Sequence, residues 1–397
     1  MRSKTAVLLT FLIFSISLSA AATQKALYTF TGGLDGAQPY AGLVSDAAGN
    51  LYGVTEFGGL YDQGIVFELT PSPDGTWTES VLYNFTGHTD GGTPIGGLGI
   101  DGSGNLYGST VNGGDPSAQC GTTFELSPSG GAWTFAVQRT FLGAPKDGCA
   151  PGADMGGGLT TVGGGRNNQG SAWDRTRMFS FGANGGSQPW GSVNSWGLGT
   201  AFNGGTHGLG TVYYLNFHCN AKPEKGGCAA TVVPKHAFGG GKNGANPLGN
   251  LLNLAVNGEW VMYGTTYGGG IGNQGLVYQL TEKSNGGWTF KVLYRFSGSD
   301  GTNPGAGLIA DSAGNLYGTT IWGGTDPGYG GTVFKLSPGV DKHNKKIWNL
   351  TTLYSFTYGE DGGEIYSGVI ADAAGNLYGT TVYGGAYGQG VVYQITP

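Results

Sequence analysis

The stretch AGLIADSAGNLYGTT at residues 306–320 decides the fold, because close copies of it occur three more times along the 397-residue chain. The copies run from Ala41 to Thr55, from Gly96 to Thr110 and from Ser367 to Thr381. Each copy is followed by a Gly-Gly pair, then by a short run typified by G-T-V-F-x-L, and most by a segment that ends in L-Y-x-F. Self-similarity at a fixed spacing is the signature of a repeat architecture.

Each unit ends in a phenylalanine, and the spacing of these phenylalanines gives the length of the repeat. The spacing is about 55 to 60 residues, apart from one shorter interval. These phenylalanines are Phe30, Phe85, Phe141, Phe181, Phe238, Phe296 and Phe356. We therefore count seven units. The third, between Pro151 and Phe181, is eroded and lacks the Asp-x-x-Gly-Asn segment. Six units with a long insertion are the alternative.

Within a unit, short apolar runs are separated by turn residues. The segment Trp288–Phe296 alternates in polarity, which predicts one strand with Trp288, Phe290, Val292, Tyr294 and Phe296 on one face. The Asp-x-x-Gly-Asn segment predicts a hairpin loop, because Asp accepts backbone N–H groups and Gly supplies a positive φ. Each unit then has four antiparallel strands: A-G-L-I, N-L-Y-G-T-T, G-T-V-F-x-L and W-T-x-x-V-L-Y-x-F. The fold class is all-β, a β-propeller of seven four-stranded blades.

The two ends of the chain predict how the ring closes. Residues 25–30 read as an outer strand with no blade before it, and residues 390–395 read as a third strand with no fourth after it. Pairing the N-terminal strand into the last blade would complete that blade and cover its exposed edge.

Composition supports an ordered β protein. Glycine and proline together contribute 82 and 16 residues, but 12% of the chain is aromatic and only 11% is charged, which is the reverse of a disordered profile. Glycine at this frequency also disfavours helices. The net charge of −6 argues against nucleic acid or an anionic membrane as a partner.

Residues 1–22 read as a secretory signal peptide with a basic start, an apolar stretch and a small-residue cleavage site, which leaves residues 23–397 as a single propeller domain. We expect a secreted protein, extracellular or periplasmic, with no membrane span. The four cysteines of an exported chain are most simply two disulfides. Topology favours Cys120–Cys149 and Cys219–Cys228, one of three possible pairings.

The run from Gly314 to Pro338, of the form G-N-L-Y-G-T-T…G-G…G-T-V-F-x-L-x-P, resembles the GloVer tandem-repeat family of exported bacterial proteins. The resemblance covers essentially all of the chain after the leader. It implies propeller-like repeats and export, and it brings no established activity or catalytic residues.

In a propeller, the T-x-x-G-G loops and the D-G-x-x-P loops lie on one face, which we call the top face. The D-G-x-x-P loops and their degenerate copy at residue 361 carry five carboxylates: Asp35, Asp90, Asp147, Asp300 and Asp361. One interpretation is that each Asp caps a turn that Gly completes. The other is a ring that binds a cation or a polar ligand.

The T-x-x-G-G loops carry aromatic side chains: Phe57, Phe202, Tyr267, Trp322 and Tyr383. Such rings would suit stacking on sugars, with neighbouring polar groups orienting the hydroxyls. They could instead pack between adjacent blades. On the opposite face, the hairpin carboxylates Asp46, Asp101, Asp311 and Asp372 are expected to be structural.

Motifs for catalysis, metals and cofactors are missing, so we expect no cofactor, no metal site and no catalytic residue that can be named from the sequence. The G-x-G-x-x-G match at residues 97–102 precedes a hairpin rather than a helix and fails as a dinucleotide site. His88 and His207 are the only histidines expected on the top face. An asymmetric site is best sought where the repeats break down, at Arg166, Asp174, Arg175 and Arg177.

Three functions fit these observations. The leading hypothesis is a secreted binding or interaction module for a glycan or a cell-surface protein. The second is a glycan-active hydrolase or lyase that uses carboxylates on the top face. The third is a structural extracellular repeat protein. The near-identity of the top loops favours the first and third, because an active site usually needs one loop set to differ.

Overall fold

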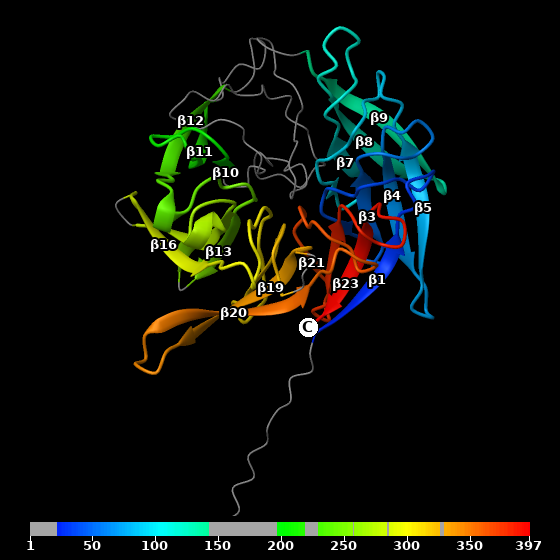
Figure 1. Ribbon diagram of the computed structural model, residues 1–397. Coiled ribbons are helices and arrows are strands. Elements are labelled where there is room, and N and C mark those ends of the chain that lie inside the picture. The colour runs from blue at the N-terminus through cyan, green and yellow to red at the C-terminus, as the bar shows by residue number, and fades with distance from the viewer. Residues whose placement is uncertain (1–21, 143–196, 219–228, 257, 284–285, 326–328) are drawn as a thin grey trace, which may run out of the picture.

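The computed structural model describes residues 22–142, 197–218, 229–256, 258–283, 286–325 and 329–397. Their strands form six sheets that stand side by side around a common centre (Figure 1), which is a β-propeller. We call the sheets blades 1 to 6 in chain order, and two short 3-10 helices, η1 (Gly241–Asn243) and η2 (Ile271–Asn273), lie in loops of the ring.

The strands of blades 1 to 5 follow the chain outward across each sheet, and in blade 6 the outermost strand is β1. Blade 1 has β2 (Val44–Ser45), β3 (Leu51–Thr55), β4 (Ile65–Pro71) and β5 (Trp77–Asn84); blade 2 has β6 (Gly99–Ile100), β7 (Leu106–Ser109), β8 (Thr122–Ser129) and β9 (Ala132–Thr140). Blade 3 has β10 (Leu198–Ala201), β11 (Thr211–His218) and β12 (Ala229–Ala237); blade 4 has β13 (Leu252–Val256), β14 (Glu259–Thr266), β15 (Leu276–Glu282) and β16 (Trp288–Arg295). Blade 5 has β17 (Ile309–Ala310), β18 (Leu316–Thr320), β19 (Thr332–Val340) and β20 (Lys346–Ser355); blade 6 has β21 (Ile370–Ala371), β22 (Leu377–Thr381), β23 (Val391–Thr396) and β1 (Thr23–Thr29).

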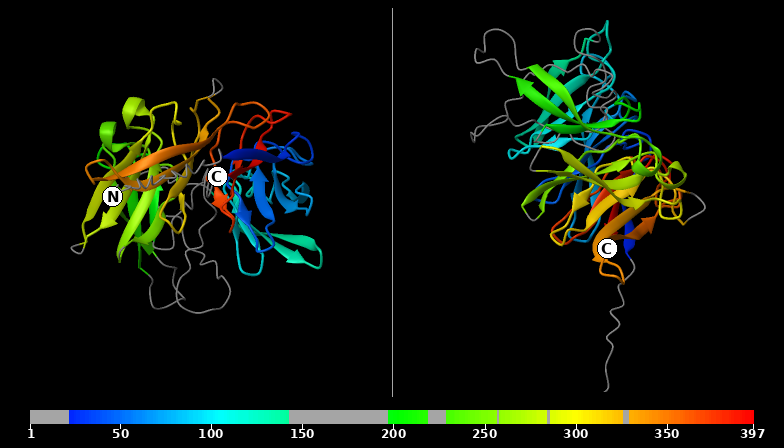
Figure 2. Two further views of the ribbon diagram at one scale, coloured as in Figure 1. Left: turned by 90° about the horizontal axis from the view of Figure 1, so that it is seen from below. Right: turned by 90° about the vertical axis from the view of Figure 1, so that its left-hand side faces the viewer.

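Ring closure by the N-terminal strand is confirmed. Strand β1 is the outermost strand of blade 6 and pairs antiparallel with β23, from Thr23 opposite Thr396 to Thr29 opposite Val391. The blue first strand lies against the red last strands in every view (Figures 1 and 2).

The described residues form six blades and give no support to seven. The unit that we expected as an eroded third blade, residues 151–181, lies outside the described residues. So does the segment that precedes β10, where the other blades have their innermost strand. The predicted pairs Cys120–Cys149 and Cys219–Cys228 also stay predictions, because only Cys120, which is buried, belongs to the described part of the chain.

The structure corrects two details of the predicted strands. The innermost strand was expected to span A-G-L-I, but in blade 5 only Ile309 and Ala310 pair with β18. The carbonyl of Ala306 instead accepts a hydrogen bond of 2.9 Å from the Thr265 hydroxyl of blade 4. The start of the innermost strand therefore bonds to the neighbouring blade rather than to its own sheet.

The second correction concerns the nine-residue alternation in the outer strand. A β-bulge at Leu293 leaves Val292 opposite Tyr278 and Tyr294 opposite Val277. Trp288, Phe290 and Val292 consequently pack toward blade 3, whereas Tyr294 packs toward blade 5. An extra residue in one strand shifts the side-chain alternation by one, so the five residues do not share a face. The same register shift recurs in the outer strand of every blade.

Neighbouring blades are held together by two repeated contacts. Thr380 of blade 6 donates a hydrogen bond of 2.9 Å to the carbonyl of Ala41, at the entry to blade 1, as Thr265 does between blades 4 and 5. The prolines of the D-G-x-x-P loops press against the preceding blade, so that a Cβ added at Gly390 would lie 2.6 Å from Pro39 Cδ. Pro94, Pro247 and Pro304 occupy the same place against Gly64, Gly210 and Gly275. These loops therefore couple the blades of the ring.

The core lies between the blades. All described phenylalanines that mark the repeat are buried, and each third strand adds a buried ring. The third-strand rings are Phe67, Phe124, Tyr213, Tyr278, Phe334 and Tyr393. Each lies over the glycine of the second strand; a Cβ added at Gly264 would lie 2.5 Å from the Tyr278 hydroxyl. The repeated N-L-Y-G motif thus keeps glycine where an aromatic ring passes.

Candidate functional site

The two loop sets that we assigned to the top face do meet there. Isolated β-bridges join the D-G-x-x-P loop of a unit to the T-x-x-G-G loop that follows in the same blade. The bridges are Ala37–Phe57, Gly92–Asn112, Ala245–Gly268, Thr302–Trp322 and Gly363–Tyr383. In these five blades the two loop sets therefore lie together, and we call this part of the ring the top rim.

The rim aspartates hold their own turns. The Asp35 carboxylate accepts hydrogen bonds from the Tyr28 hydroxyl at 3.0 Å, from the Thr31 backbone N–H at 2.8 Å and from the Thr31 hydroxyl. Asp90, Asp300 and Asp361 likewise accept from a tyrosine hydroxyl and from a backbone N–H of their turn. The next residue must be small, because Gly36 has φ +88° and a Cβ there would lie 2.4 Å from Thr55 Oγ1.

These contacts match the turn-capping interpretation of the described rim aspartates. A carboxylate that accepts three hydrogen bonds at fixed positions has little capacity left for a ligand. Asp147 lies outside the described residues, and so do Arg166, Asp174, Arg175 and Arg177. Sequence reasoning missed the tyrosine partner, although L-Y-x-F precedes nearly every D-G-x-x-P loop.

The hairpin aspartates on the opposite face are structural, as expected. Asp46 accepts from the backbone N–H groups of Ala48 and Asn50, from the Asn50 side chain and from the Tyr52 hydroxyl, all between 2.9 and 3.0 Å. These hydrogen bonds outweigh the effect of burial and lower the pKa of Asp46. Asp101, Asp311 and Asp372 repeat the arrangement. The D-x-x-G-N-x-Y motif is thus a self-contained turn.

An arc of aromatic rings follows the top rim across five blades. The ring centroids of Phe202 and Tyr267 are 6.1 Å apart, and those of Tyr267 and Trp322 are also 6.1 Å apart, both edge to face. Trp322 meets Tyr366 at 6.5 Å, and Tyr366 stacks on Tyr40 at 4.6 Å. All five rings are partly exposed. We call Phe202, Tyr267, Trp322, Tyr366 and Tyr40 the aromatic arc.

The aromatic arc shows the packing between adjacent blades that one interpretation expected, and its contact with a ligand stays a prediction. Its rings contact one another across blade boundaries, and each still presents surface to solvent. Three of the five rings were among the residues predicted for the top face. Tyr40 and Tyr366 were missed. Each is the fifth residue after a rim aspartate, Asp35 or Asp361. Of the other predicted rings, Phe57 is 37% exposed, and Tyr383 stacks on Tyr358 at 6.3 Å.

The arc ends at an acidic, tyrosine-rich group between blades 6 and 1. We call Tyr40, Glu56, Tyr358, Glu364, Tyr366 and Tyr383 the seam cluster. Within it, the Tyr358 hydroxyl donates a hydrogen bond of 2.5 Å to Glu364 Oε1. Glu56 accepts no hydrogen bond from the described residues, and its burial raises its pKa.

Three tyrosines of the seam cluster, Tyr40, Tyr358 and Tyr366, resist ionisation. Burial, with the negative charges of Glu56 and Glu364 nearby, raises the pKa of Tyr40. Burial, and then the neighbouring Tyr40 and Glu364, raise the pKa of Tyr366. The phenols therefore stay neutral and can donate hydrogen bonds while the glutamates supply negative charge. Sequence analysis named Tyr383 of this cluster as a candidate ligand-binding residue, but it placed the asymmetry of the ring in units three and four rather than at this boundary.

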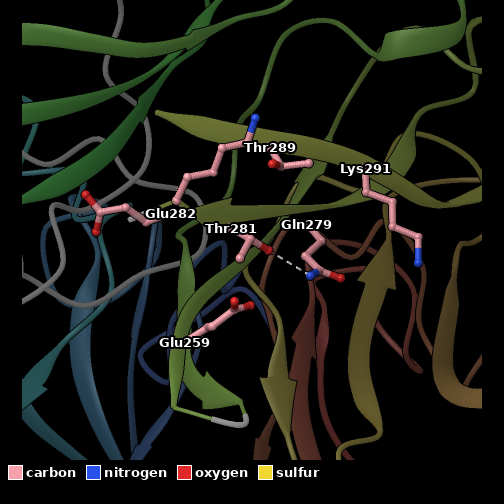
Figure 3. A pocket seen from close by; sticks show the side chains of 7 residues that line it. Glu259, Gln279, Thr281, Glu282, Thr289 and Lys291 are labelled. Atoms are coloured by element: carbon pink, nitrogen blue, oxygen red, sulfur yellow. Dashed lines mark hydrogen bonds between the residues drawn. The ribbon is translucent and has the colours of Figure 1, made fainter. Parts of the chain in front are cut away.

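A separate polar hollow lies on blade 4 (Figure 3). Its volume is about 510 Å³, and it is lined by Glu259, Gln279, Thr281, Glu282, Lys283, Thr289 and Lys291. These residues stand near the β13–β14 and β15–β16 hairpins, at the end of the blade away from the top rim. Their polar groups include a hydrogen bond of 2.9 Å from the Gln279 side chain to Thr281. The hollow is open and shares no residue with the seam cluster.

Within the described parts of the chain, no group of three His, Cys, Asp or Glu side chains is arranged to hold a metal ion. No described helix is long and apolar enough to cross a membrane. The two histidines expected on the top face, His88 and His207, are exposed and lie in loops of different blades.

Solved structures similar to this chain share little sequence with it. A putative oxidoreductase (glucose dehydrogenase) from Thermus thermophilus is 14% identical, with a TM-score of 0.46, 94% of this chain covered and 100% of that chain. An α-L-arabinofuranosidase of Fusarium graminearum is 12% identical, with a TM-score of 0.41 and coverages of 95% and 97%. Likeness at this level says nothing about activity. No curated protein matches the chain.

The repeats themselves are matched. The Gloeobacter/Verrucomicrobia repeat matches residues 11–174 and 224–397, which together make up most of the sequence. This match agrees with the resemblance seen in the motif of residues 314–338. The chain belongs to the Gloeobacter/Verrucomicrobia repeat family.

Proposed function

We propose that this protein is a secreted binding module that holds glycan chains along the aromatic arc of the top rim. The observation that carries the proposal is the arc itself, in which five partly exposed rings lie in contact from blade 3 to blade 1. Aromatic faces stack on the apolar faces of sugar rings, and a row of rings suits an extended polymer. Residues 1–22 would direct export and would then be removed by a signal peptidase.

A rigid frame is a further argument for binding. The blade couplings through Pro39 and Thr380 hold the rim loops in place, so the rings lose little conformational freedom when a ligand docks. The described rim aspartates serve the turns and would contribute little to the ligand directly.

The test is a glycan array probed with the purified chain without residues 1–22, followed by calorimetry on the best oligosaccharide. We expect Trp322→Ala to weaken binding by roughly tenfold, since a stacked aromatic ring contributes about 1 kcal/mol or more. Tyr383→Ala tests whether the adjacent ring outside the arc takes part. Trp260→Ala is the matched control, because Trp260 is 47% exposed on β14 near the opposite end of its blade. Binding unchanged by Trp322→Ala would reject the proposal.

A glycan-cleaving enzyme is the second candidate, and one observation favours it. Glu56 and Glu364 lie in the same cluster, and burial raises the pKa of Glu56, as general acids require. Incubating the protein with the oligosaccharide that binds best, and measuring new reducing ends, separates binding from cleavage. Activity that survives both Glu56→Gln and Glu364→Gln would exclude this pair as the catalytic groups.

A further inference from the structure

The seam cluster differs from the other blade boundaries in its charge. At the repeat position of Glu56, the other described blades carry neutral side chains, namely Val111, Phe202, Tyr267, Ile321 and Val382. At the position of Glu364 they carry Gln38, Thr93, Asn246 and Asn303. Both carboxyl groups are therefore special to the boundary between blades 6 and 1.

Two of the neutral residues at the Glu364 position, Asn246 and Asn303, have a structural role that a carboxylate cannot perform. Asn246 donates a hydrogen bond of 3.0 Å to the carbonyl of Phe202 in the preceding blade, and Asn303 donates one of 2.9 Å to Tyr267. A carboxylate has no hydrogen to donate. The Glu364 side chain instead accepts from Tyr358, so this side-chain bond to the preceding blade is replaced by a carboxyl group within the cluster, while the backbone N–H of Glu364 still bonds to Gly330.

The negative charge of the cluster is not balanced within the described residues. Neither Glu56 nor Glu364 forms an ion pair there, and no Lys, Arg or His belongs to the cluster. An ionised carboxylate that is partly buried without a cation is costly, and a positively charged ligand would remove that cost. The four tyrosine rings also favour a cation, because their faces attract positive charge.

We propose that the seam cluster binds a protonated amine, and that the glycans held by the aromatic arc are amino sugars with a free amino group. This inference rests on the proposed glycan-binding function. The ammonium group would lie between Glu56 and Glu364 and against the stacked rings of Tyr40 and Tyr366, where charge-assisted hydrogen bonds and cation–π attraction act together. A hard metal ion suits the cluster less well, since such ions require more oxygen ligands than two carboxyl groups provide.

The test is calorimetry at pH 6 with two oligosaccharides of equal length, a β-1,4-glucosamine hexamer and its fully N-acetylated counterpart. They share the same backbone and linkage, and N-acetylation replaces each chargeable amine by a neutral amide. We expect the glucosamine hexamer to bind at least about tenfold more tightly, with the preference reduced by added salt. Glu364→Gln and Glu56→Gln should each remove most of the preference. Glu282→Gln, which changes a carboxyl group on the blade 4 hollow, is the matched control.

The outcomes separate this inference from the proposed function. Equal affinity for the two hexamers, or a preference that survives both glutamine variants, overturns the amine inference and leaves glycan binding intact. If neither hexamer binds while the array shows other glycans bound, the amino-sugar assignment also fails. A lysine oligomer that binds through Glu56 and Glu364 while the glucosamine hexamer does not would reject the assignment in favour of a basic peptide.

Discussion

The boundary between blades 1 and 2 and the boundary between blades 6 and 1 use the same turn but differ in the side chain that covers it. Tyr83 bonds to Asp90 at 3.0 Å, and Phe135 of blade 2 stacks on Tyr83 with ring centroids 3.8 Å apart. An apolar ring therefore covers the turn at this boundary. It represents the ordinary contact of the ring.

At the closing boundary, Tyr28 bonds to Asp35 at the same distance of 3.0 Å, but Glu79 occupies the repeat position of Phe135. Burial, and then the charge of Asp35, raise the pKa of Glu79 to about 7, and its Oε1 atom is buried without a described partner. The repeats therefore preserve the turn and vary the side chain that lies against it. The closing boundary therefore carries additional carboxyl groups in two places, at Glu79 on the outer strand and in the seam cluster on the rim.

The largest effect should come from removing the phenylalanine that anchors each outer strand. Phe30 and Phe85 are both fully buried at equivalent positions, so Phe30→Ala and Phe85→Ala should each cost about 3 to 5 kcal/mol of unfolding free energy. Denaturant titration of both variants measures the costs. A much larger loss in Phe30→Ala would show that the closing boundary limits the stability of the whole ring.

The next effect concerns the two turn aspartates. Asp90→Ala should cost about 2 to 3 kcal/mol at pH 7, because the Tyr83 hydroxyl and a backbone N–H lose their acceptor. Asp35→Ala should cost less, since it also removes a negative charge beside Glu79. Equal losses, measured by denaturant titration at pH 7, would argue against coupling between Asp35 and Glu79.

A smaller effect should depend on pH. The pKa of Glu79 rises from an ordinary 4.5 to about 7 on folding, so the folded protein binds this proton more tightly than the unfolded chain does. The stabilisation that comes from this tighter proton binding is therefore complete below pH 4.5, and it is lost as the pH rises through 7. After allowance for solvent screening of this half-buried group, we expect a loss of about 1 to 2 kcal/mol.

In Glu79→Gln, the unfolding free energy should change less between pH 5 and pH 8 than it does in the unaltered protein. Thermal melts across this range compare the two proteins, with Glu68→Gln as a control for a glutamate on the same blade. A slope that persists in Glu79→Gln would assign the pH dependence to other groups. The aspartates whose pKa is lowered, such as Asp46, lose their contribution only in more acidic solution.

The smallest expected effect concerns the buried aromatic side chains on the third strand of each blade. Tyr393 in blade 6 and Tyr278 in blade 4 are fully buried, and their hydroxyls have no hydrogen-bond partner among the described residues. Blades 1, 2 and 5 have Phe67, Phe124 and Phe334 there. Tyr393→Phe should therefore raise the unfolding free energy by about 1 kcal/mol. A destabilised variant would mean that the hydroxyl is satisfied in solution.

Much of the fold could be predicted because it is repeated. The copies of A-G-L-I-A-D-S-A-G-N-L-Y-G-T-T identify hairpins and strand order, and the incomplete units at the two ends predict the pairing of β1 with β23. The bulge at Leu293 could not be predicted, because nothing in an alternating apolar pattern marks which residue is left unpaired. The seven-unit count depended on residues 151–181, which lie outside the described part of the ring.

The candidate site was predicted only in outline. Phe202, Tyr267 and Trp322 were identified because they stand in a recurring loop. Tyr366 and Tyr40 depend on contact between the last unit and the first, which no local pattern reveals. The rim aspartates were proposed as a site because they recur. They recur because each one holds the turn at the entry to its blade. Glu56 and Glu364 were missed for the opposite reason, since each occurs once.

The hydrogen bond from Thr380 to Ala41 joins residues 339 positions apart in the chain. Closing a long loop costs little more free energy than closing one half as long, about 0.6 kcal/mol per doubling, so the seam need not be thermodynamically weak. Contacts this distant in sequence form late during folding. The seam cluster, built from both ends of the chain, would then be assembled in the last step, and ligand binding there would report that the ring has closed.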